Sequence, residues 1–313
     1  VRWIYDESSD CSDTSSVPEV QENGEIVSGE TTSTFADTVS GRWVTPCYRH
    51  SSEPWRRYSM PVYVKMVHSM TATWGGDSAC VVDQAKQWSF DGDGLTASGS
   101  TDLIKFVVDD TDCASSSDAP LTGADLDGVA MYLDADSTST FIFESAVAGQ
   151  YLNLCYKFGN EEFMWYDIQA FAHMVQFVDS QVGGKDIAVV DVEEILVVHA
   201  NGTSLQDHMR WVVSSETSDA ACSDAVLVRD SPNEGANDIT DIPIYDEVGS
   251  FLASFTFNAS SAGLSPTLCY KFADEPWKVY ADVTINLAML QEVYANEGSD
   301  KVAVVDYSKM WTM

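Results

Sequence analysis

The sequence is poor in basic residues. Its 313 residues include 16 Lys and Arg against 49 Asp and Glu, which gives a formal net charge of −33 at pH 7. Nucleic acid binding requires clustered Lys and Arg beside the phosphates, so the composition excludes a nucleic acid partner and disfavours anionic membrane surfaces. A well-solvated surface, cation binding and life in high salt are each compatible with this charge.

Several motifs are also absent. No apolar run approaches the roughly 18 to 20 residues of a membrane helix, so we expect no membrane insertion. The sequence has no HExxH, P-loop or GxGxxG motif, and its histidines and cysteines lack the CxxC or HxxxH spacing of a zinc site. The segment from Gly76 to Ala79 only faintly resembles the nucleophile turn of a serine protease. We therefore expect no enzyme and no required cofactor.

The main feature of the sequence is an internal repeat. The stretch LCYKFGNEEFMWYDI around Cys155 recurs as LCYKFADEPWKVYADV around Cys269 and as PCYRHSSEPWRRYSMPV around Cys47. In each copy a Cys-Tyr pair is followed at equal distances by a glutamate (Glu53, Glu161, Glu275), an aromatic residue (Trp55, Phe163, Trp277) and a tyrosine (Tyr58, Tyr166, Tyr280). A unit of roughly one hundred residues has the size of a domain, so the repeat predicts tandem modules.

A second repeated stretch marks the expected joints between modules. It reads GGDSACVVD from Gly75, GGKDIAVVD from Gly183 and GSDKVAVVD from Gly298. From these positions we expect four segments: an incomplete first module that lacks its first strands (1–74), a second module (75–182), a third module (183–297), and the first strand of a further module or a donor strand for module one of a neighbour (298–313).

Six of the seven cysteines occupy equivalent places in the repeat. Cys11 with Cys47, Cys113 with Cys155, and Cys222 with Cys269 predict three disulfides within modules, which indicates an oxidising compartment. Cys80 is left over, because alanine stands at the matching positions of the other copies. It is either a buried free thiol or half of an intermolecular bridge.

Two sequons, at Asn201 and Asn258, are candidate glycosylation sites. Together with the cysteine pattern they favour an extracellular or cell-surface glycoprotein.

Short apolar segments rich in Val, Ile, Phe, Trp and Tyr alternate with turn-rich segments, as in IAVVDV, MRWVVS and FLASFTFN. Such segments are typical of β-strands, and no long segment with helical periodicity interrupts them. The fold class predicted is all-β, with tandem immunoglobulin-like β-sandwich modules of about 100 residues. The aromatic residues that follow each Cys-Tyr pair are expected to pack in the core or in a hairpin.

Two signatures carry a resemblance to a known class of proteins: the GxGL turn from Gly92 to Leu95 before a basic-aromatic strand, and the CYKFxxEPW stretch. They resemble the modules of large secreted surface proteins of algae and other protists, including flagellar-hair proteins. The resemblance implies tandem extracellular sandwiches that build fibres or coats, and it brings no catalytic residues. The third module departs from it, because Ala200 to Thr203 replace the GxGL turn.

The two ends of the sequence complement each other. The basic-aromatic strand occurs as Lys105-Phe106-Val107 and Arg210-Trp211-Val212, and it also opens the chain as Arg2-Trp3-Ile4. The segment expected before that strand is found instead at residues 303–313. Three explanations remain open: strand addition between copies in a head-to-tail polymer, a longer continuous chain, and closure within one chain. The expected assembly strand carries Val302, Val304, Met310 and Trp311.

Acidic turns are the nearest approach to a ligand site. Alternating carboxylates occur at Asp91 and Asp93, at Asp125 and Asp127, and at Asp134 and Asp136. None completes a twelve-residue calcium loop, so the alternatives are solvated turns and weak Ca²⁺ binding.

Two functions fit these observations. The first is a structural repeat protein of an extracellular filament or coat, whose partners are copies of itself. The alternative is a cell-surface adhesion or glycan-binding module, in which exposed aromatic residues would contact glycans. Aromatic residues buried between sheets would favour the first.

Overall fold

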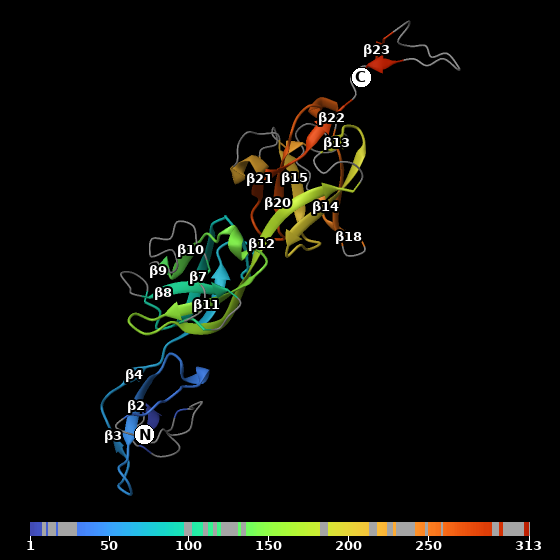
Figure 1. The fold of residues 1–313 in the computed structure, drawn as a ribbon. Helices are drawn as coiled ribbons and strands as arrows, with labels where there is room; N and C mark the ends of the chain where they lie inside the picture. Colours follow the sequence, from blue (N-terminus) through green and yellow to red (C-terminus); the bar gives the residue numbers. More distant parts are fainter. Residues whose placement is uncertain are drawn as a thin grey trace. The chain divides into compact units, whose positions relative to one another are not determined.

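The fold was analysed in a computed structural model of the chain, drawn in Figure 1. It divides into two compact units, Val1–Ala172 and His173–Met313, which are described separately. The structure describes residues 1–7, 11, 17, 30–96, 102–108, 112–114, 118–119, 131–132, 136–181, 187–212, 218–223, 228–229, 242–247, 250–257, 259–289, 294–296 and 310–312.

The first unit begins with a small antiparallel sheet. Its central strand pairs with three others, in the order β1-β2-β3 with β4 also on β2. The strands are β1 (Arg2–Tyr5), β2 (Trp43–Tyr48), β3 (Arg56–Arg57) and β4 (Val62–Tyr63). The 3-10 helix η2 (Asp37–Val39) buries Val39 against Val17 and Val44, while Trp3 and Phe35 pack against this cluster from its edge.

The rest of the first unit is a sandwich of two sheets. One sheet has the order β10-β7-β5, and the other has the order β9-β8-β11-β12 with β6 on β12. The elements are β5 (Met66–Ala72), β6 (Ala79–Val81), β7 (Lys86–Asp93), β8 (Leu103–Val108), β9 (Met131–Tyr132), β10 (Thr138–Phe141), η3 (Ser145–Val147), β11 (Tyr151–Lys157) and the start of β12 (Met164–Ser180). Between the sheets Trp88, Phe106, Phe141 and Phe143 form a fully buried aromatic cluster.

The second unit repeats this arrangement. Strands β18, β19, β14 and the second half of β12 form one sheet, β16, β15, β20, β21 and β17 form another, and β13 pairs with β22 in parallel. The elements are β13 (Ile187–Val189), β14 (Glu193–Asn201), β15 (His208–Val212), η4 (Asp219–Ser223), β16 (Val228–Arg229), β17 (Ile242–Pro243), β18 (Tyr245–Glu247), β19 (Ser250–Thr256), η5 (Ala259–Ser261), β20 (Thr267–Lys271), β21 (Lys278–Thr284), β22 (Asn286–Ala288), β23 (Tyr294–Ala295) and β24 (Trp311–Thr312). Trp211, Phe255 and Phe257 pack together as the buried aromatic cluster.

One hairpin occurs three times with the same register. Its paired positions are Ala72 with Trp88 in β5 and β7, Ser180 with Leu196 in β12 and β14, and Ala295 with Trp311 in β23 and β24. The loop of the hairpin holds the repeated GGDSACVVD stretch, whose Asp83 and Asp191 adopt positive φ of 54° and 58°. Each of these two aspartates donates its backbone N–H to the carbonyl of the matching phenylalanine, Phe143 or Phe257, at 2.7 Å.

The hairpin spans the joints expected at Gly75 and Gly183. The segment that follows β2 pairs with it through Val62 and Tyr63, and it continues as β5, which pairs with β7 of the following sandwich. Strand β12 also pairs in two successive modules, and it does so as one uninterrupted strand. It pairs with β11 over Met164–Phe171 and with β14 over Met174–Ser180. The expected segment bounds stay a prediction, whereas the pairing shows that one strand serves two successive modules.

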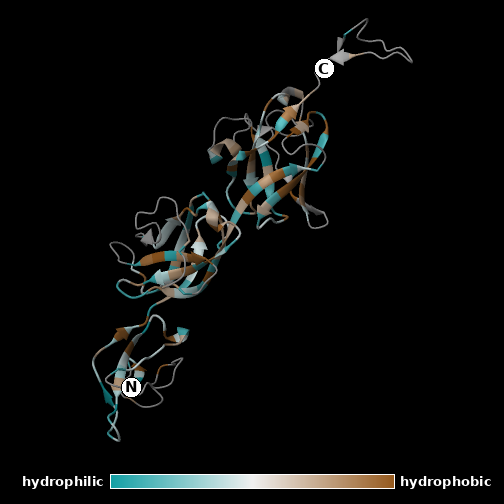
Figure 2. Ribbon diagram, viewed as in Figure 1, coloured by the Kyte–Doolittle hydropathy of each residue, from teal (hydrophilic) through white to brown (hydrophobic). Residues whose placement is uncertain are grey.

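The predicted all-β class is confirmed. Apart from the parallel β13–β22 pair, the described strands form antiparallel sheets that pack face to face, and the helices among the described residues are short 3-10 turns. In Figure 2 hydrophobic and hydrophilic residues both occur along the strands, as expected of sheets that cover a core on one side. The turn glycine also recurs, because Gly94 and Gly202 both have positive φ, at 74° and 77°. The third module therefore keeps the one glycine that the turn requires.

We expect Trp88→Ala to destabilise the sandwich of the first unit by about 3–5 kcal/mol, because it leaves a cavity among Phe106, Phe141 and Phe143. Urea denaturation followed by circular dichroism measures the loss. The matched control is Trp74→Ala, since Trp74 is 38% exposed. Equal losses from the two substitutions would contradict the assigned core.

Candidate functional site

Each predicted disulfide is present, and an aromatic ring packs against two of the three. Cys11–Cys47, Cys113–Cys155 and Cys222–Cys269 join Cα atoms that are 5.8 or 5.9 Å apart. In the last two, Phe163 and Trp277 pack against the bridge. These are the aromatic residues that follow each Cys-Tyr pair, so the repeated spacing serves core packing, as expected.

A basic side chain covers the outer face of each of these rings. Arg2 lies 4.5 Å from the centre of the Trp55 ring, Lys105 4.8 Å from that of Phe163, and Arg210 4.1 Å from that of Trp277. Arg2 and Arg210 also donate hydrogen bonds of 2.8 Å to the carbonyls of Cys11 and Cys222. The basic residue of the basic-aromatic strand therefore has a structural role, through a cation–π contact and a backbone hydrogen bond.

Two buried aspartates organise the turns after the Cys-Tyr strands. Asp102 accepts hydrogen bonds from the Tyr156 hydroxyl at 2.9 Å and the Gly159 N–H at 2.8 Å. Asp207 likewise accepts a hydrogen bond from the Tyr270 hydroxyl at 2.8 Å and one from the Ala273 N–H at 2.9 Å. Both aspartates are 1% exposed. Burial, and next the nearby carboxylate, raise the pKa of each tyrosine, so both phenols stay protonated donors.

Sequence reasoning missed these aspartates. A signal was available, because each lies three residues before the basic residue of a basic-aromatic strand, as Asp102 does before Lys105 and Asp207 before Arg210. Their partners lie far along the chain, and spacing within one strand does not reveal them.

We expect Tyr270→Phe to lower the free energy of unfolding of the second unit by about 1.5–3 kcal/mol, since it removes a hydrogen bond to a buried carboxylate. Urea denaturation provides the measurement. Tyr58→Phe is the matched control because Tyr58 is 41% exposed. A loss no larger than that of the control would show that the Asp207 contact contributes little.

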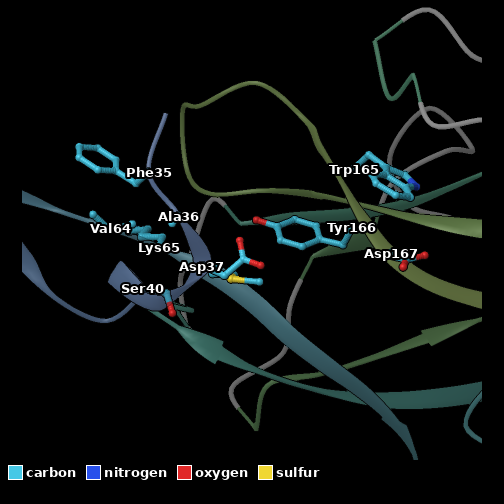
Figure 3. A pocket seen from close by; sticks show the side chains of 10 residues that line it. Phe35, Ala36, Asp37, Ser40, Val64, Lys65, Trp165, Tyr166 and Asp167 are labelled. Atoms are coloured by element: carbon cyan, nitrogen blue, oxygen red, sulfur yellow. The ribbon is translucent and has the colours of Figure 1, made fainter. Parts of the chain in front are cut away.

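A pocket lies in the first unit, beside η2 and the start of β12 (Figure 3). It has a volume of about 340 Å³ and is lined by Phe35, Ala36, Asp37, Ser40, Val64, Lys65, Met66, Trp165, Tyr166 and Asp167. In Figure 3 the Tyr166 hydroxyl points toward Asp37, whereas Trp165 and Asp167 extend from the other side of their strand. This follows from the alternation of side chains along β12.

The polar groups of the pocket include one phenol and one exposed carboxylate. Burial raises the pKa of Tyr166, and a backbone hydrogen bond with Val67 partly opposes this, so its phenol is protonated near neutral pH. Asp37 is exposed. Together with Ser40, Lys65 and Asp167, which also line the pocket, these groups can hold a polar ligand.

Beside the pocket, Asp93 joins the β7 end to the turn at Ser40 and Gly41. Its carboxylate lies 2.8 Å from Nε2 of His68, and this hydrogen bond, followed by one from Ser40, lowers the pKa of Asp93 below its usual 3.8. A Cβ on Gly41 would stand 2.6 Å from the Asp93 carboxylate, and Gly41 has a φ of 74°. Only glycine therefore fits beneath Asp93.

The lowered pKa of Asp93 predicts a pH dependence. Its contribution to stability is fully present above the unfolded pKa of about 3.8 and is lost as pH falls through the lower folded value. We expect the thermal midpoint of the wild type to fall more between pH 5 and about pH 2 than that of Asp93→Asn. Parallel pH profiles of the two proteins would contradict the assignment.

The remaining candidate residues are dispersed. Asp91 and Asp136 are exposed, Asp93 is held by His68, and Asp125, Asp127 and Asp134 lie outside the described residues. Among the residues that the structure describes, no three His, Cys, Asp or Glu side chains gather as metal ligands. Weak Ca²⁺ binding stays a prediction.

The leftover cysteine and the first sequon are described, and the second sequon is not. Cys80 is a buried thiol outside the three disulfides, as one of the two alternatives predicted, and its Sγ lies 3.7 Å from the Phe171 carbonyl. Asn201 ends β14 and is half-buried, whereas Asn258 lies outside the described residues.

The assembly strand is described only at its end. Trp311 lies opposite Ala295 in the β23–β24 hairpin, Met310 is 71% exposed, and Val302 and Val304 lie outside the described residues. In the part of the chain that the structure covers, no helix has the length and apolar character to cross a membrane.

Comparison with known proteins gives no family for the chain. No family model and no curated protein matches it. Among solved structures, it is similar to SGBP-B of the Bacteroides ovatus mixed-linkage glucan utilization locus, solved with a mixed-linkage heptasaccharide. The two sequences are 8% identical, the match covers 70% of this chain and 45% of that chain, and the TM-score is 0.21. It is also similar to extracellular domains 3-5 of Drosophila OTK. Here the identity is 8%, the match covers 92% of this chain and 85% of that chain, and the TM-score is 0.21. The chain thus spans less than half the length of the first protein, and overlaps this loose carry no functional argument.

Proposed function

We propose that the chain is a non-catalytic structural repeat protein of an extracellular filament or surface coat, comparable to flagellar-hair proteins, whose subunits associate head to tail. The observation that carries this proposal is β12, a single strand that pairs with β11 over Met164–Phe171 and with β14 over Met174–Ser180, so that two successive modules share it. The hairpin that β12 opens recurs at β5–β7 and at β23–β24. Such joints suit a protein that bears load along its chain.

The aromatic residues support a building block over a binding module. The largest of them, Trp88 and Trp211, are buried between sheets, and Trp277 covers a disulfide. Each buried aspartate has a structural partner, and the disulfides favour an oxidising extracellular setting.

Glycan binding is the second candidate. Two aromatic pairs recur at matching exposed positions, because Trp43 contacts Tyr63 with ring centres 5.1 Å apart and Tyr151 contacts Phe171 at 5.0 Å. Trp43 and Tyr151 are each 53% exposed. Exposed rings of this kind are surfaces on which a sugar can stack.

Negative-stain electron microscopy of the native, non-reduced protein tests the structural role. We expect long filaments or sheets with a repeat of module size. Dispersed particles, together with retention on a glycan array that Trp43→Ala or Tyr151→Ala abolishes, would instead support the glycan-binding function.

A further inference from the structure

The backbone places one pair of residues at the same position in each module. A turn glycine donates its N–H to a carbonyl further along the chain, at 2.8 or 2.9 Å: Gly41 to Val64, Gly149 to Ala172 and Gly263 to Leu287. The residue two positions after this glycine contacts the residue just before that carbonyl, which gives the pairs Trp43–Tyr63, Tyr151–Phe171 and Ser265–Asn286. The three pairs therefore occupy equivalent places in the repeat.

The fold does not require aromatic rings at this place. Trp43 and Tyr151 are each 53% exposed, so their rings are not part of the core. In the third module the pair is polar and exposed, and Ser265 donates a hydrogen bond of 2.8 Å to Oδ1 of Asn286. That module makes the same backbone hydrogen bonds without the rings. The exposed rings of the first two modules therefore favour contact with a ligand over a role in packing.

The Trp43–Tyr63 pair borders the pocket of Figure 3. The pocket is lined by Ser40 from the segment that carries Trp43, and by Lys65 from the segment that carries Tyr63. The two segments run side by side, because the backbone N–H and carbonyl of Val64 both bond across to the other segment. An occupant of the pocket can therefore reach the pair.

Gly94 keeps Tyr63 and Lys65 on one side of their segment. A Cβ on Gly94 would stand 2.9 Å from Cε1 of Tyr63 and 2.8 Å from Cγ of Lys65, so both side chains lie directly over this glycine. Residues two apart in an extended segment point to the same side, and they stand about 6.6 Å apart. The rings and the pocket lining therefore form one continuous surface.

The groups that line the pocket favour an uncharged ligand. Asp37 and Lys65 bring opposite charges to the lining, so both an anion and a cation would meet a like charge there. The net charge of −33 also repels anions. The Tyr166 hydroxyl, which points toward Asp37 in Figure 3, can donate and accept hydrogen bonds, while Phe35 and Val64 are apolar. A neutral sugar matches these groups, because it has several hydroxyls, apolar C–H faces and no charge.

We propose that the pocket and the Trp43–Tyr63 rings form one binding site for a neutral oligosaccharide, with one sugar in the pocket and a neighbouring sugar stacked on the rings. The pocket volume of about 340 Å³ is at the lower end of the range for small-molecule sites, which suits a single sugar. The rings offer flat apolar faces to the C–H groups of the next sugar. This inference rests on the glycan-binding candidate and gives it a site and a ligand class.

Calorimetric titration of the full chain tests the ligand class. The neutral probes are hexasaccharides of a β-glucan, a mannan and a galactan. Hexagalacturonate is the anionic comparison, and a chitosan hexamer is the cationic one. We expect at least one neutral hexasaccharide to bind roughly tenfold more tightly than either charged one. Equal or tighter binding of a charged hexasaccharide, or no binding of any neutral one, would overturn the proposal.

The pair of the third module supplies a variant that removes the rings. Trp43→Ser with Tyr63→Asn installs a pair that the fold accepts at this place, so the thermal midpoint should stay close to that of the wild type. The affinity for the neutral hexasaccharide should fall roughly tenfold, because the stacking surface is lost. The matched control is Trp74→Ser, since Trp74 is 38% exposed and does not line the pocket. Wild-type affinity in the ring variant would contradict the site.

Asp37→Asn tests the pocket without the rings. Asp37 is exposed, so the substitution should leave the fold intact and lower the affinity roughly tenfold through the loss of a charged acceptor. Glu53→Gln is the control, since Glu53 is also exposed and lies outside the lining. Sugar binding that neither Asp37→Asn nor the ring variant weakens would reject this site and leave glycan binding standing. Filaments in native material without any sugar binding would reject the site and leave the structural function standing.

Discussion

The sandwich depends on one constraint, which is that a large apolar residue on the hairpin strand must fill the space between two sheets. Trp88 contacts Phe106 and Phe143 in the second module, and Leu196 is buried at the matching position of the third module, where Trp211 and Phe257 are buried as well. The other strand of the hairpin, β5 or β12, is the one that comes from the preceding module, and β12 pairs with β11 before it pairs with β14. The strand that carries the filling residue is therefore paired with a strand that enters from the preceding module.

A second set of interactions fixes the opposite sheet. There the disulfide, the aromatic ring above it and the basic side chain above the ring are stacked in order, as Cys222–Cys269, Trp277 and Arg210 show. The covalent bond sets the spacing of two segments, while the ring excludes water from the sulfur atoms. Three of the 16 Lys and Arg residues, Arg2, Lys105 and Arg210, lie over these rings, which explains why a basic residue recurs at this place in the repeat.

Much of this organisation could be predicted from sequence, because repeated copies reveal which residues share an environment. The cysteine pairs, the β-strands and the role of Trp277 followed from matched positions. Asp102 and Asp207 did not, since their tyrosine partners lie 54 and 63 residues further along the chain, and neither did the Asp93–His68 contact, whose partners lie 25 residues apart. The strand shared by two modules was also missed, because the conspicuous glycine-rich stretch is the loop of a hairpin whose strands lie on both sides of it.

The disulfides also set a limit on extensibility. In the two complete modules the bridged cysteines are 42 and 47 residues apart in the sequence. If tension opened such a module, the residues within the bridged loop could not lengthen the chain, which gains about 3.3–3.6 Å for each freed residue. Roughly two fifths of each of these modules is thereby withheld from stretching while the bridge is intact, so the opening of one module would lengthen the chain by less than its full extended length.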